Sequence, residues 1–310
     1  MMNNMKGKSL ASLYDLTKEE IEEVLKTSEL LKLQLIKGEE HLLLKGKTLA
    51  MVFEKPSTRT RVSFEVGMFQ LGGHALYLSV NDLQLGRGET IADTARVLSR
   101  YVDGIMARVF DHQTILDLIK YSRVPVINGL SDFSHPCQGL ADLFTIYEKR
   151  GRLSGLKLAY IGDGNNVAHS LLYGCSKMGL DITLGCPKGY EPNLGVVSQA
   201  KKEGRRTGSK VKVTNNPREA VRGADIVYTD VWASMGKEKE RKERLKVFKS
   251  YQVNTDLTRE AKEDYLFMHC LPAHRGEEVT NEVADSKNSV IFDQAENRMH
   301  TQKALLTLIM

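Results

Sequence analysis

Residues 48–69 read TLAMVFEKPSTRTRVSFEVGMF, a stretch that predicts a buried strand followed by a helix. The run from Thr48 to Phe53 is short and apolar, and Pro56 marks the turn that ends it. Apolar residues then recur from Val62 to Phe69, as in a helix that begins near this turn. A strand that leads into a helix is the first half of a β-α-β unit, so the stretch indicates a parallel sheet covered by helices.

The same alternation predicts two series of strands. In the first series, strands are expected at residues 48–53, 75–80, 104–109 and 124–128, with helices at 90–101 and 111–121. In the second, strands are expected at residues 156–161, 181–184, 211–214, 226–229 and 266–269, with an edge strand at 290–292. A capping box at Thr17 and Glu20 predicts a further helix that ends near Gly38. The sequence therefore predicts an α/β fold.

The length of 310 residues favours two domains, since one domain usually holds roughly 100 to 200 residues. A turn-like run near Gly151 separates the two series of strands. We expect one domain at residues 1–150 and a second at 151–293, each a parallel β-sheet flanked by helices, with the active site in the cleft between them. A last helix at residues 294–310 is expected to dock back on the first domain.

Composition and charge argue against several classes of protein. Hydrophobic residues at 41% and charged residues at 27% are typical of a globular chain. The four cysteines form no C-x-x-C pair, which argues against a disulfide framework and a structural zinc site. The net charge of +5 is spread along the chain, which argues against nucleic acid as a partner. Because no stretch reaches the roughly 18 apolar residues of a membrane helix, we expect a cytoplasmic protein without a membrane partner.

Five polar residues, Ser57-Thr58-Arg59-Thr60-Arg61, lie at the turn between the first strand and its helix. Free N–H groups at a helix N-terminus, hydroxyl groups and guanidinium groups together bind anions. A lone Ser-Thr-Arg would more simply be a helix cap with a solvent-facing arginine. Five such residues at one turn favour a phosphate site instead.

Two more candidates follow later strands of the first domain. Arg108 lies near the end of the third strand, and His135-Pro136-Cys137-Gln138 follows the fourth and opens a helix near Gly139. Because ligands of parallel sheets bind beyond the carboxyl ends of the strands, we expect these residues to face the same crevice as the phosphate site. A lone histidine is more often structural, but here an imidazole, an arginine and an amide could polarise one carbonyl group.

The second domain offers a glycine-rich turn, Gly162-Asp163-Gly164, after its first strand. A dinucleotide-binding motif would need a third glycine where Val167 stands, so we expect no nicotinamide or flavin cofactor. Asn165 and Asn166 lie at the start of the next helix. Their side chains could hold a ligand or cap the helix.

Two strand ends of the second domain carry reactive or charged side chains. In a strand that continues through His269-Cys270, the two side chains point to opposite faces and cannot pair as base and nucleophile. The bond Leu271-Pro272 could be cis, which would leave the carbonyls of Cys270 and Leu271 aimed into the crevice. Asp230 ends a strand and is followed by a Ser-Met-Gly turn, so it suits either a ligand ammonium group or an Asx-turn.

Taken together, these segments resemble the carbamoyltransferases, and specifically the ornithine branch of the aspartate/ornithine carbamoyltransferase family. Residues 57–61, 135–138 and 267–272 look like the carbamoyl-phosphate elements of that family. Residues 230–236 look like its ornithine-binding loop. The matching segments occur in order over nearly the whole chain.

The resemblance implies a role for each matching residue. The phosphate of carbamoyl phosphate would be held by Ser57, Thr58, Arg59, Thr60 and Arg298. Its carbonyl oxygen would be held by Thr60, Arg108 and His135, and its nitrogen by Gln138 and the carbonyls of Cys270 and Leu271. Ornithine would be oriented by Asn166, Asp230, Ser234 and Met235, with its amine near Cys270. Gln84 would reach the site of a neighbouring subunit, which implies a homotrimer or a higher assembly of trimers. No metal and no organic cofactor is implied.

The implied reaction is direct attack of the side-chain amine of L-ornithine on carbamoyl phosphate, through a tetrahedral intermediate, to give L-citrulline and phosphate. Such a reaction belongs to arginine biosynthesis. Putrescine and N-acetylated ornithine are alternative acceptors, whereas aspartate would need a basic loop where Asp230 stands. A non-catalytic module of the same fold that binds a phosphorylated ligand is an alternative from a different class.

Overall fold

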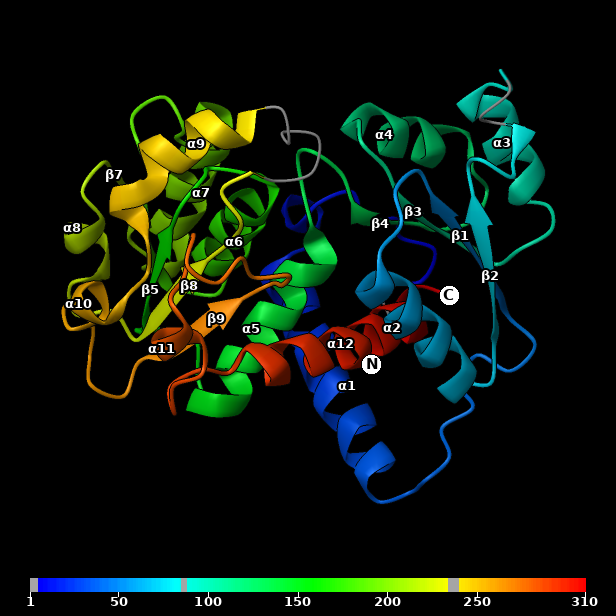
Figure 1. Cartoon of the computed structure of the whole chain (residues 1–310). Helices are drawn as coiled ribbons and strands as arrows, with labels where there is room; N and C mark the ends of the chain where they lie inside the picture. The colour runs from blue at the N-terminus through cyan, green and yellow to red at the C-terminus, as the bar shows by residue number, and fades with distance from the viewer. Residues whose placement is uncertain (1–4, 85–87, 234–239) are drawn as a thin grey trace. The chain divides into compact units, whose positions relative to one another are not determined.

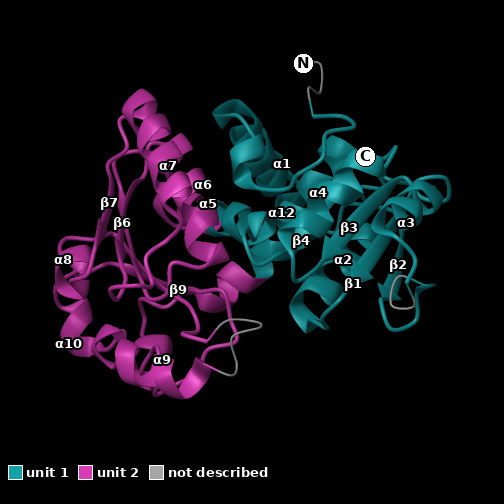
Figure 2. Ribbon diagram, turned by 90° about the horizontal axis from the view of Figure 1, so that it is seen from above, with its two compact units in different colours: residues 1–144, 296–310 teal, residues 145–295 magenta. Residues whose placement is uncertain are grey.

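The computed structural model describes residues 5–84, 88–233 and 240–310. Two compact units divide the chain, the first made of residues 1–144 and 296–310 and the second of residues 145–295 (Figure 2). Each unit holds one parallel sheet with helices around it, which confirms the predicted α/β fold with two parallel-sheet domains. The chain passes from one unit to the other within helix α5 (Pro136–Arg150) and again within α12 (Ile291–Ile309).

Unit 1 is built on a four-stranded parallel sheet in the order β2-β1-β3-β4 (Figure 1). Its strands are β1 (Thr48–Phe53), β2 (His74–Ser79), β3 (Gly104–Arg108) and β4 (Val126–Leu130). The order reverses between β1 and β3, and such a switch point is where parallel sheets bind ligands. Phe53 pairs with Arg108 across it, so β1 and β3 end level at the same edge.

Helices cover the sheet of unit 1. They are α1 (Lys18–Ile36), α2 (Thr58–Gln70), α3 (Ile91–Leu98), α4 (His112–Tyr121) and the parts of α5 and α12 that belong to this unit. Alternate residues of β1 and β3, such as Ala50 and Ile105, form a buried cluster with Ile115 of α4 and with α3. Helix α1 begins at the predicted capping box of Thr17 and Glu20.

Unit 2 is built on a five-stranded parallel sheet in the order β7-β6-β5-β8-β9. Its strands are β5 (Lys157–Ile161), β6 (Asp181–Gly185), β7 (Val211–Thr214), β8 (Ile226–Thr229) and β9 (Leu266–His269). Its helices, besides the rest of α5 and α12, are α6 (Asn166–Lys177), α7 (Leu194–Thr207), α8 (Pro217–Val221), α9 (Arg241–Phe248), α10 (Thr255–Thr258) and α11 (Asn281–Ala284). The switch point of this sheet lies between β5 and β8.

Two element predictions differ from the structure. Residues 290–292 form no edge strand: Val290 donates one N–H to Phe267 and helix α12 begins at the next residue. Ile291 is buried whereas Phe292 is 70% exposed, which is the pattern of a helix start on a surface. Strand β4 also begins and ends two residues later than predicted, and the polar Asn128 lies buried within it, where its Nδ2 donates to the carbonyl of Ala11.

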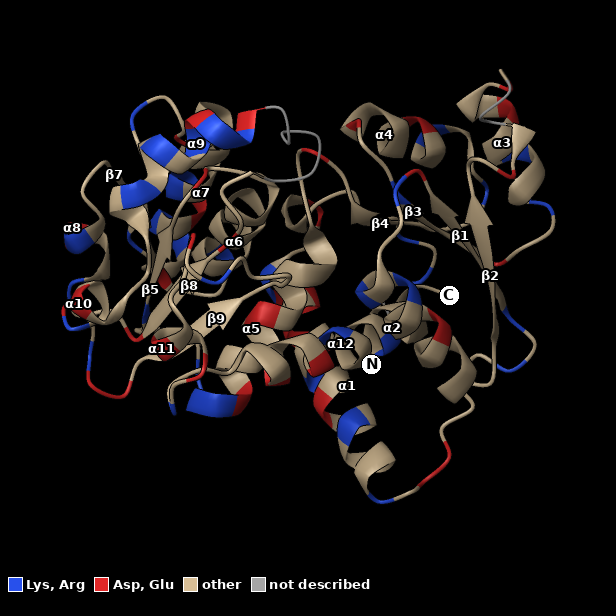
Figure 3. Cartoon of the chain, viewed as in Figure 1, with Lys and Arg blue, Asp and Glu red and all other residues tan. Residues whose placement is uncertain are grey.

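Charged residues are spread over the helices of each unit, although basic residues predominate on α9 (Figure 3). A charged run such as residues 237–246 is typical of a solvated loop and helix face, and we expect one here from the sequence. Its first three residues lie outside the described part, and within α9 Arg244 is buried, contrary to that expectation. Among the described residues, no helix is long and apolar enough to cross a membrane.

Candidate active site

The turn after β1 forms an N-terminal cap on α2. The Ser57 hydroxyl accepts the N–H of Thr60 at 3.4 Å, and Ser57 Oγ lies 3.2 Å from Thr60 Oγ1. Thr60 itself is 1% exposed. The predicted Ser-Thr-Arg turn is therefore a helix N-terminus whose hydroxyl groups point toward one another.

Thr60 joins this turn to two arginines from other elements. Arg108, the last residue of β3, donates from Nη1 to Thr60 Oγ1 at 3.5 Å. Arg298 of α12 donates from Nη2 to the same oxygen at 3.2 Å, and Arg298 is 3% exposed. Three segments that are far apart in the sequence thus place two guanidinium groups around one hydroxyl group, as an anion site requires.

Arg298 also reaches the helix that follows β4. Its Nη1 donates to Gln138 Oε1 at 2.9 Å, and Gln138 Nε2 donates to Asp142 Oδ1 at 2.8 Å. Gln138 and Asp142 lie one turn apart on α5 and are buried. These bonds orient the Gln138 amide with its oxygen, a hydrogen-bond acceptor, toward Arg298.

His135 is a buried imidazole next to this cluster and directly precedes α5. Its pKa lies well below the ordinary value, because of burial and the positive charges of Arg298, Arg108 and Arg59. The ring is therefore neutral near pH 7. A neutral imidazole can donate a hydrogen bond to a carbonyl oxygen without adding charge to the site.

Other predicted residues of unit 1 lie apart from this cluster. Thr58 is the exposed first residue of α2, and Arg61 pairs with Glu65 at 3.0 Å and covers the ring of Tyr77. Gln84 is also exposed, and its carbonyl accepts the N–H of Glu89. Within the described residues, no hydrogen bond joins the Gln84 side chain to Thr60, Arg108 or Arg298.

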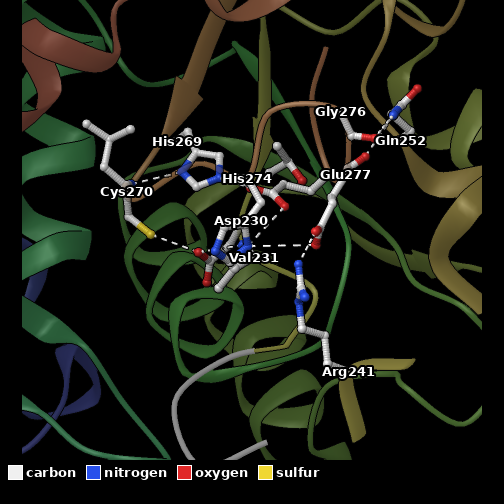
Figure 4. A network of polar contacts seen from close by, with 12 residues as sticks. Asp230, Val231, Arg241, Gln252, His269, Cys270, His274, Gly276 and Glu277 are labelled. Carbon is white, nitrogen blue, oxygen red and sulfur yellow. Dashed lines mark hydrogen bonds and ion pairs between the residues drawn. The ribbon is translucent and has the colours of Figure 1, made fainter. Parts of the chain in front are cut away.

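In unit 2, Asp230 follows β8 and is 6% exposed. Its Oδ1 accepts the N–H of Val231 at 2.8 Å and the thiol of Cys270 at 3.0 Å (Figure 4). Its Oδ2 accepts Nδ2 of Asn165 at 2.7 Å. The carboxyl group therefore connects the ends of three strands, rather than closing an Asx-turn on its own backbone.

The loop after β5 completes this edge of unit 2. Gly164 lies so close to Pro192 that a Cβ atom there would be 2.2 Å from the Pro192 nitrogen, so only glycine fits. Asn165 caps α6 by accepting the N–H groups of Val167 and Ala168, and Asn166 is the first residue of that helix. The turn is thus a helix start beside Asp230.

His269 and Cys270 do not bond to each other, as predicted from their positions. Cys270 bonds to Asp230, whereas His269 Nε2 lies 3.2 Å from Glu278 Oε1 and His269 Nδ1 accepts the N–H of Leu271 at 2.9 Å. The bond Leu271-Pro272 is cis. The predicted ornithine residues Ser234 and Met235 lie outside the described residues.

Among the described residues, one of two groups with the composition of a metal site is formed by Asp230, His269 and Cys270, whose ligand atoms all lie within 4.8 Å of one another. Both ring nitrogens of His269 already have hydrogen-bond partners, however. The group is therefore better described as a hydrogen-bond network than as a cation site.

Comparison with known proteins agrees with this geometry. A family model described as "Aspartate/ornithine carbamoyltransferase, carbamoyl-P binding domain" matches residues 8–148, and one described as "Aspartate/ornithine carbamoyltransferase, Asp/Orn binding domain" matches residues 154–309. The chain belongs to the aspartate/ornithine carbamoyltransferase family.

Full-length relatives in this family carry one activity in their names. The "Ornithine carbamoyltransferase" of Thermococcus kodakarensis is 60% identical, over 100% of this chain and 98% of that protein. The "Ornithine carbamoyltransferase, anabolic" of Pyrococcus furiosus is also 60% identical, with the same coverage. A solved structure of the Pyrococcus furiosus ornithine carbamoyltransferase matches 99% of this chain and 98% of its own, with 60% identity and a TM-score of 0.96.

One buried residue of unit 2 was not predicted from the sequence to have a role. Arg244 of α9 donates to Asp163 Oδ2 at 2.8 Å, to the carbonyl of Trp232 at 2.9 Å and to Glu240 at 2.9 Å. It thereby joins the loop after β5 to the loop after β8. Because Arg244 stands in a charged run, nothing in the sequence distinguishes it from its exposed neighbours.

Proposed function

We propose that the chain transfers the carbamoyl group of carbamoyl phosphate to the side-chain amine of L-ornithine, giving L-citrulline and phosphate. The observation that carries the proposal is a buried polar cluster at the switch point of each sheet, in a chain whose full-length relatives are named ornithine carbamoyltransferases. We assign residues 1–150 to carbamoyl-phosphate binding, with the helix at 294–310 docked on them, and residues 151–293 to ornithine binding.

Carbamoyl phosphate would bind to unit 1. We assign its phosphate to Ser57, Thr58, Arg59, Thr60 and Arg298, its carbonyl oxygen to Thr60, Arg108 and His135, and its nitrogen to Gln138. The orientation of the Gln138 amide supports this, because the oxygen that faces Arg298 can accept a hydrogen bond from an NH2 group. The carbonyls of Cys270 and Leu271 are proposed to accept from the same nitrogen.

Ornithine would bind to unit 2, through Asn166, Asp230, Ser234 and Met235, with its side-chain amine near Cys270. The Asp230 carboxyl group supports this assignment, since a buried carboxylate can hold a ligand ammonium group. The acceptor must be able to fill such a site. Putrescine lacks the α-carboxylate and the α-amine of an amino acid and would leave part of the site unused.

The proposed chemistry is direct transfer. The neutral amine of ornithine attacks the carbonyl carbon, and the carbonyl electron pair moves onto oxygen next to Arg108, His135 and Thr60. When the carbonyl reforms, the bond to phosphate breaks and its electron pair leaves with the phosphate. The attacking nitrogen loses a proton, which passes to the departing phosphate. Carbamoyl phosphate is already activated, and holding the two reactants in line can supply about 7 to 11 kcal/mol of the barrier, so no covalent enzyme intermediate is needed.

We further propose a homotrimer or a higher assembly of trimers, in which Gln84 completes the site of a neighbouring subunit. The exposed position of Gln84 supports this. We also propose that the enzyme acts in the cytoplasm and in the direction of citrulline synthesis, as the name of the anabolic relative suggests.

The direct test is an assay for citrulline and phosphate with carbamoyl phosphate and each of three acceptors: ornithine, putrescine and N-acetylornithine. We expect the highest kcat/KM with ornithine and equal amounts of the two products. A higher kcat/KM with putrescine would show that putrescine, and not ornithine, is the acceptor. Binding of carbamoyl phosphate without turnover of any acceptor would favour a non-catalytic module of the same fold.

A further inference from the structure

The turn that follows β9 carries Cys270 and Leu271 and is held at both ends by one carboxyl group. Glu278 Oε1 lies 3.2 Å from His269 Nε2, just before the turn, and accepts the N–H of His274, at its end. The side chains of His269 and Glu278 are both 0% exposed. Figure 4 shows His269, Cys270 and His274 around this turn.

The hydrogen bonds fix the tautomer of His269. Its Nδ1 accepts the N–H of Leu271 at 2.9 Å, so this nitrogen carries a lone pair and the ring proton is on Nε2, facing Glu278. The backbone N–H of His269 donates to Gln294 Oε1 at 2.9 Å. The imidazole therefore has one fixed orientation, in which it can accept from the peptide of Leu271.

Leu271 needs such support because its backbone is in the left-handed region, with φ of 58°. This conformation costs an L-residue other than glycine or asparagine of the order of 1 kcal/mol and persists only where neighbouring groups hold it. The bond from Leu271 to His269 Nδ1 supplies one such restraint. It also determines the direction of the peptide group between Cys270 and Leu271, because the Cys270 carbonyl points opposite to the bonded N–H. The left-handed backbone of Leu271 then sets the direction of its own carbonyl.

We propose that His269 and Glu278 are positioning residues for the transfer reaction, because together they hold the Cys270 thiol against Asp230 and direct the carbonyls of Cys270 and Leu271. This inference rests on the proposed function, in which those carbonyls accept from the carbamoyl nitrogen. The pair touches no reacting atom itself. An apolar pair would fill the same space without the cost of burying a carboxyl group, so stability alone does not explain it.

The first test compares Glu278→Leu with Glu278→Gln. Glutamine keeps a carbonyl oxygen that can accept from both His269 and His274, whereas leucine keeps only the approximate volume. We expect Glu278→Leu to lower kcat about 100-fold, as expected for a misplacement of about 1 Å, and Glu278→Gln to stay within about tenfold of wild type. Glu277→Leu is the matched control, because Glu277 is more exposed and pairs with Arg241 at the surface; it should keep wild-type kcat.

A second pair of variants tests the bond to Leu271. Asparagine at position 269 can accept the N–H of the residue two positions ahead, as in an Asx-turn, but leucine cannot. His269→Asn should therefore retain more than ten times the kcat of His269→Leu. The pair keeps the proposal testable if Glu278→Leu does not fold.

Inhibition by inorganic phosphate separates positioning from general damage, since phosphate lacks the carbamoyl group that the turn is proposed to contact. We expect its Ki to be unchanged in folded variants with reduced kcat. Wild-type kcat in folded Glu278→Leu and His269→Leu, or a Ki that rises in step with the loss of kcat, would overturn the proposal. Absence of citrulline formation by the wild-type enzyme would instead refute the proposed function on which it rests.

Discussion

Thr60 has a short side chain that lies between two guanidinium groups, those of Arg108 and Arg298. One hydroxyl oxygen offsets the repulsion between two positive charges only in part. An acyl phosphate would offset it more fully, with one arginine near the phosphate and the other near the carbonyl oxygen. This is the physical reason for dividing their roles in the proposed reaction.

Replacement of Arg108 by alanine tests that division. We expect Arg108→Ala to lower kcat by roughly 100- to 1,000-fold, the loss found when one donor to a developing oxyanion is removed. The measurement is kcat at saturating concentrations of both substrates, with circular dichroism to verify folding. Arg96→Ala is the control, because Arg96 is an exposed residue of α3 that pairs with Asp93, and it should keep wild-type turnover. Full turnover by folded Arg108→Ala would remove Arg108 from the mechanism.

Asp230 should act on the other substrate. Asp230→Asn removes the charge proposed to bind ornithine but keeps the size of the side chain, so KM for ornithine should rise at least tenfold while KM for carbamoyl phosphate stays within about twofold. The magnitude corresponds to about 1.4 kcal/mol, the lower end for a charge-assisted hydrogen bond. Steady-state kinetics with each substrate varied in turn gives both constants. Equal increases in the two constants would contradict the assignment of separate substrates to separate units.

Residue patterns predicted only part of these clusters. Ser57 and His135 follow strands of one parallel sheet and Arg108 ends another strand of it, so the strand-end rule placed all three at one edge. Arg298 stands more than 150 residues further along, inside a helix, and its role came only from family resemblance. Glu278 does not follow a strand, so the strand-end rule does not apply to it. Its hydrogen-bond partners depend on tertiary packing, which no sequence pattern indicates.

Among the helices, α12 is largely buried and yet carries several polar and charged side chains within unit 1. Lys303 is 0% exposed, and its Nζ lies 2.6 Å from His41 Nε2 and 2.8 Å from Gln70 Oε1. Burial lowers the pKa of Lys303 from its ordinary value to about 8. The helix thus carries a buried amine whose hydrogen-bond partners are an imidazole and a side-chain amide.

This shift predicts a pH dependence of stability. Between pH 8 and about 10.4, the unfolded chain keeps the Lys303 proton that the folded chain has lost. The unfolded state then binds more protons, so this lysine makes the free energy of unfolding increase with pH, by up to ~3 kcal/mol. Lys303→Met lacks the group and should lose that increase.

The measurement is the melting temperature of both proteins at pH 8 and pH 10. From pH 8 to pH 10, the melting temperature of wild type should rise by several degrees relative to that of Lys303→Met. Lys287→Met replaces a lysine outside the buried cluster and serves as the control, with the wild-type change expected. An equal change in all three proteins would show that Lys303 titrates as an ordinary surface lysine.

Helices and strands were predicted correctly where the pattern of apolar residues was clear. They were predicted wrongly where a polar residue is buried in a strand or where an apolar run is too short to distinguish a strand from a helix. The five strands of unit 2 lie close to their predicted positions because each is a short apolar or alternating run between turns. Asn128 looked like a strand end but lies buried within β4. The apolar residues 290–292 looked like a strand but begin a helix, because a three-residue apolar run fits either element.

At the scale of the whole molecule, each unit has its own parallel sheet, its own switch point and its own polar cluster. The proposed reaction requires both, because the phosphate of one substrate and the amino acid of the other need sites of opposite charge. Guanidinium groups gather in unit 1 and a buried carboxyl group in unit 2, as this division requires. The activity should therefore depend on the complete chain.

The most direct measurement follows the carbonyl carbon of ¹³C-labelled carbamoyl phosphate by NMR in the presence of enzyme and ornithine. We predict that the label appears in citrulline, that phosphate is released in equal amount, and that both rates depend on ornithine. Label that appears in carbonate at the same rate with and without ornithine would contradict the proposed transfer.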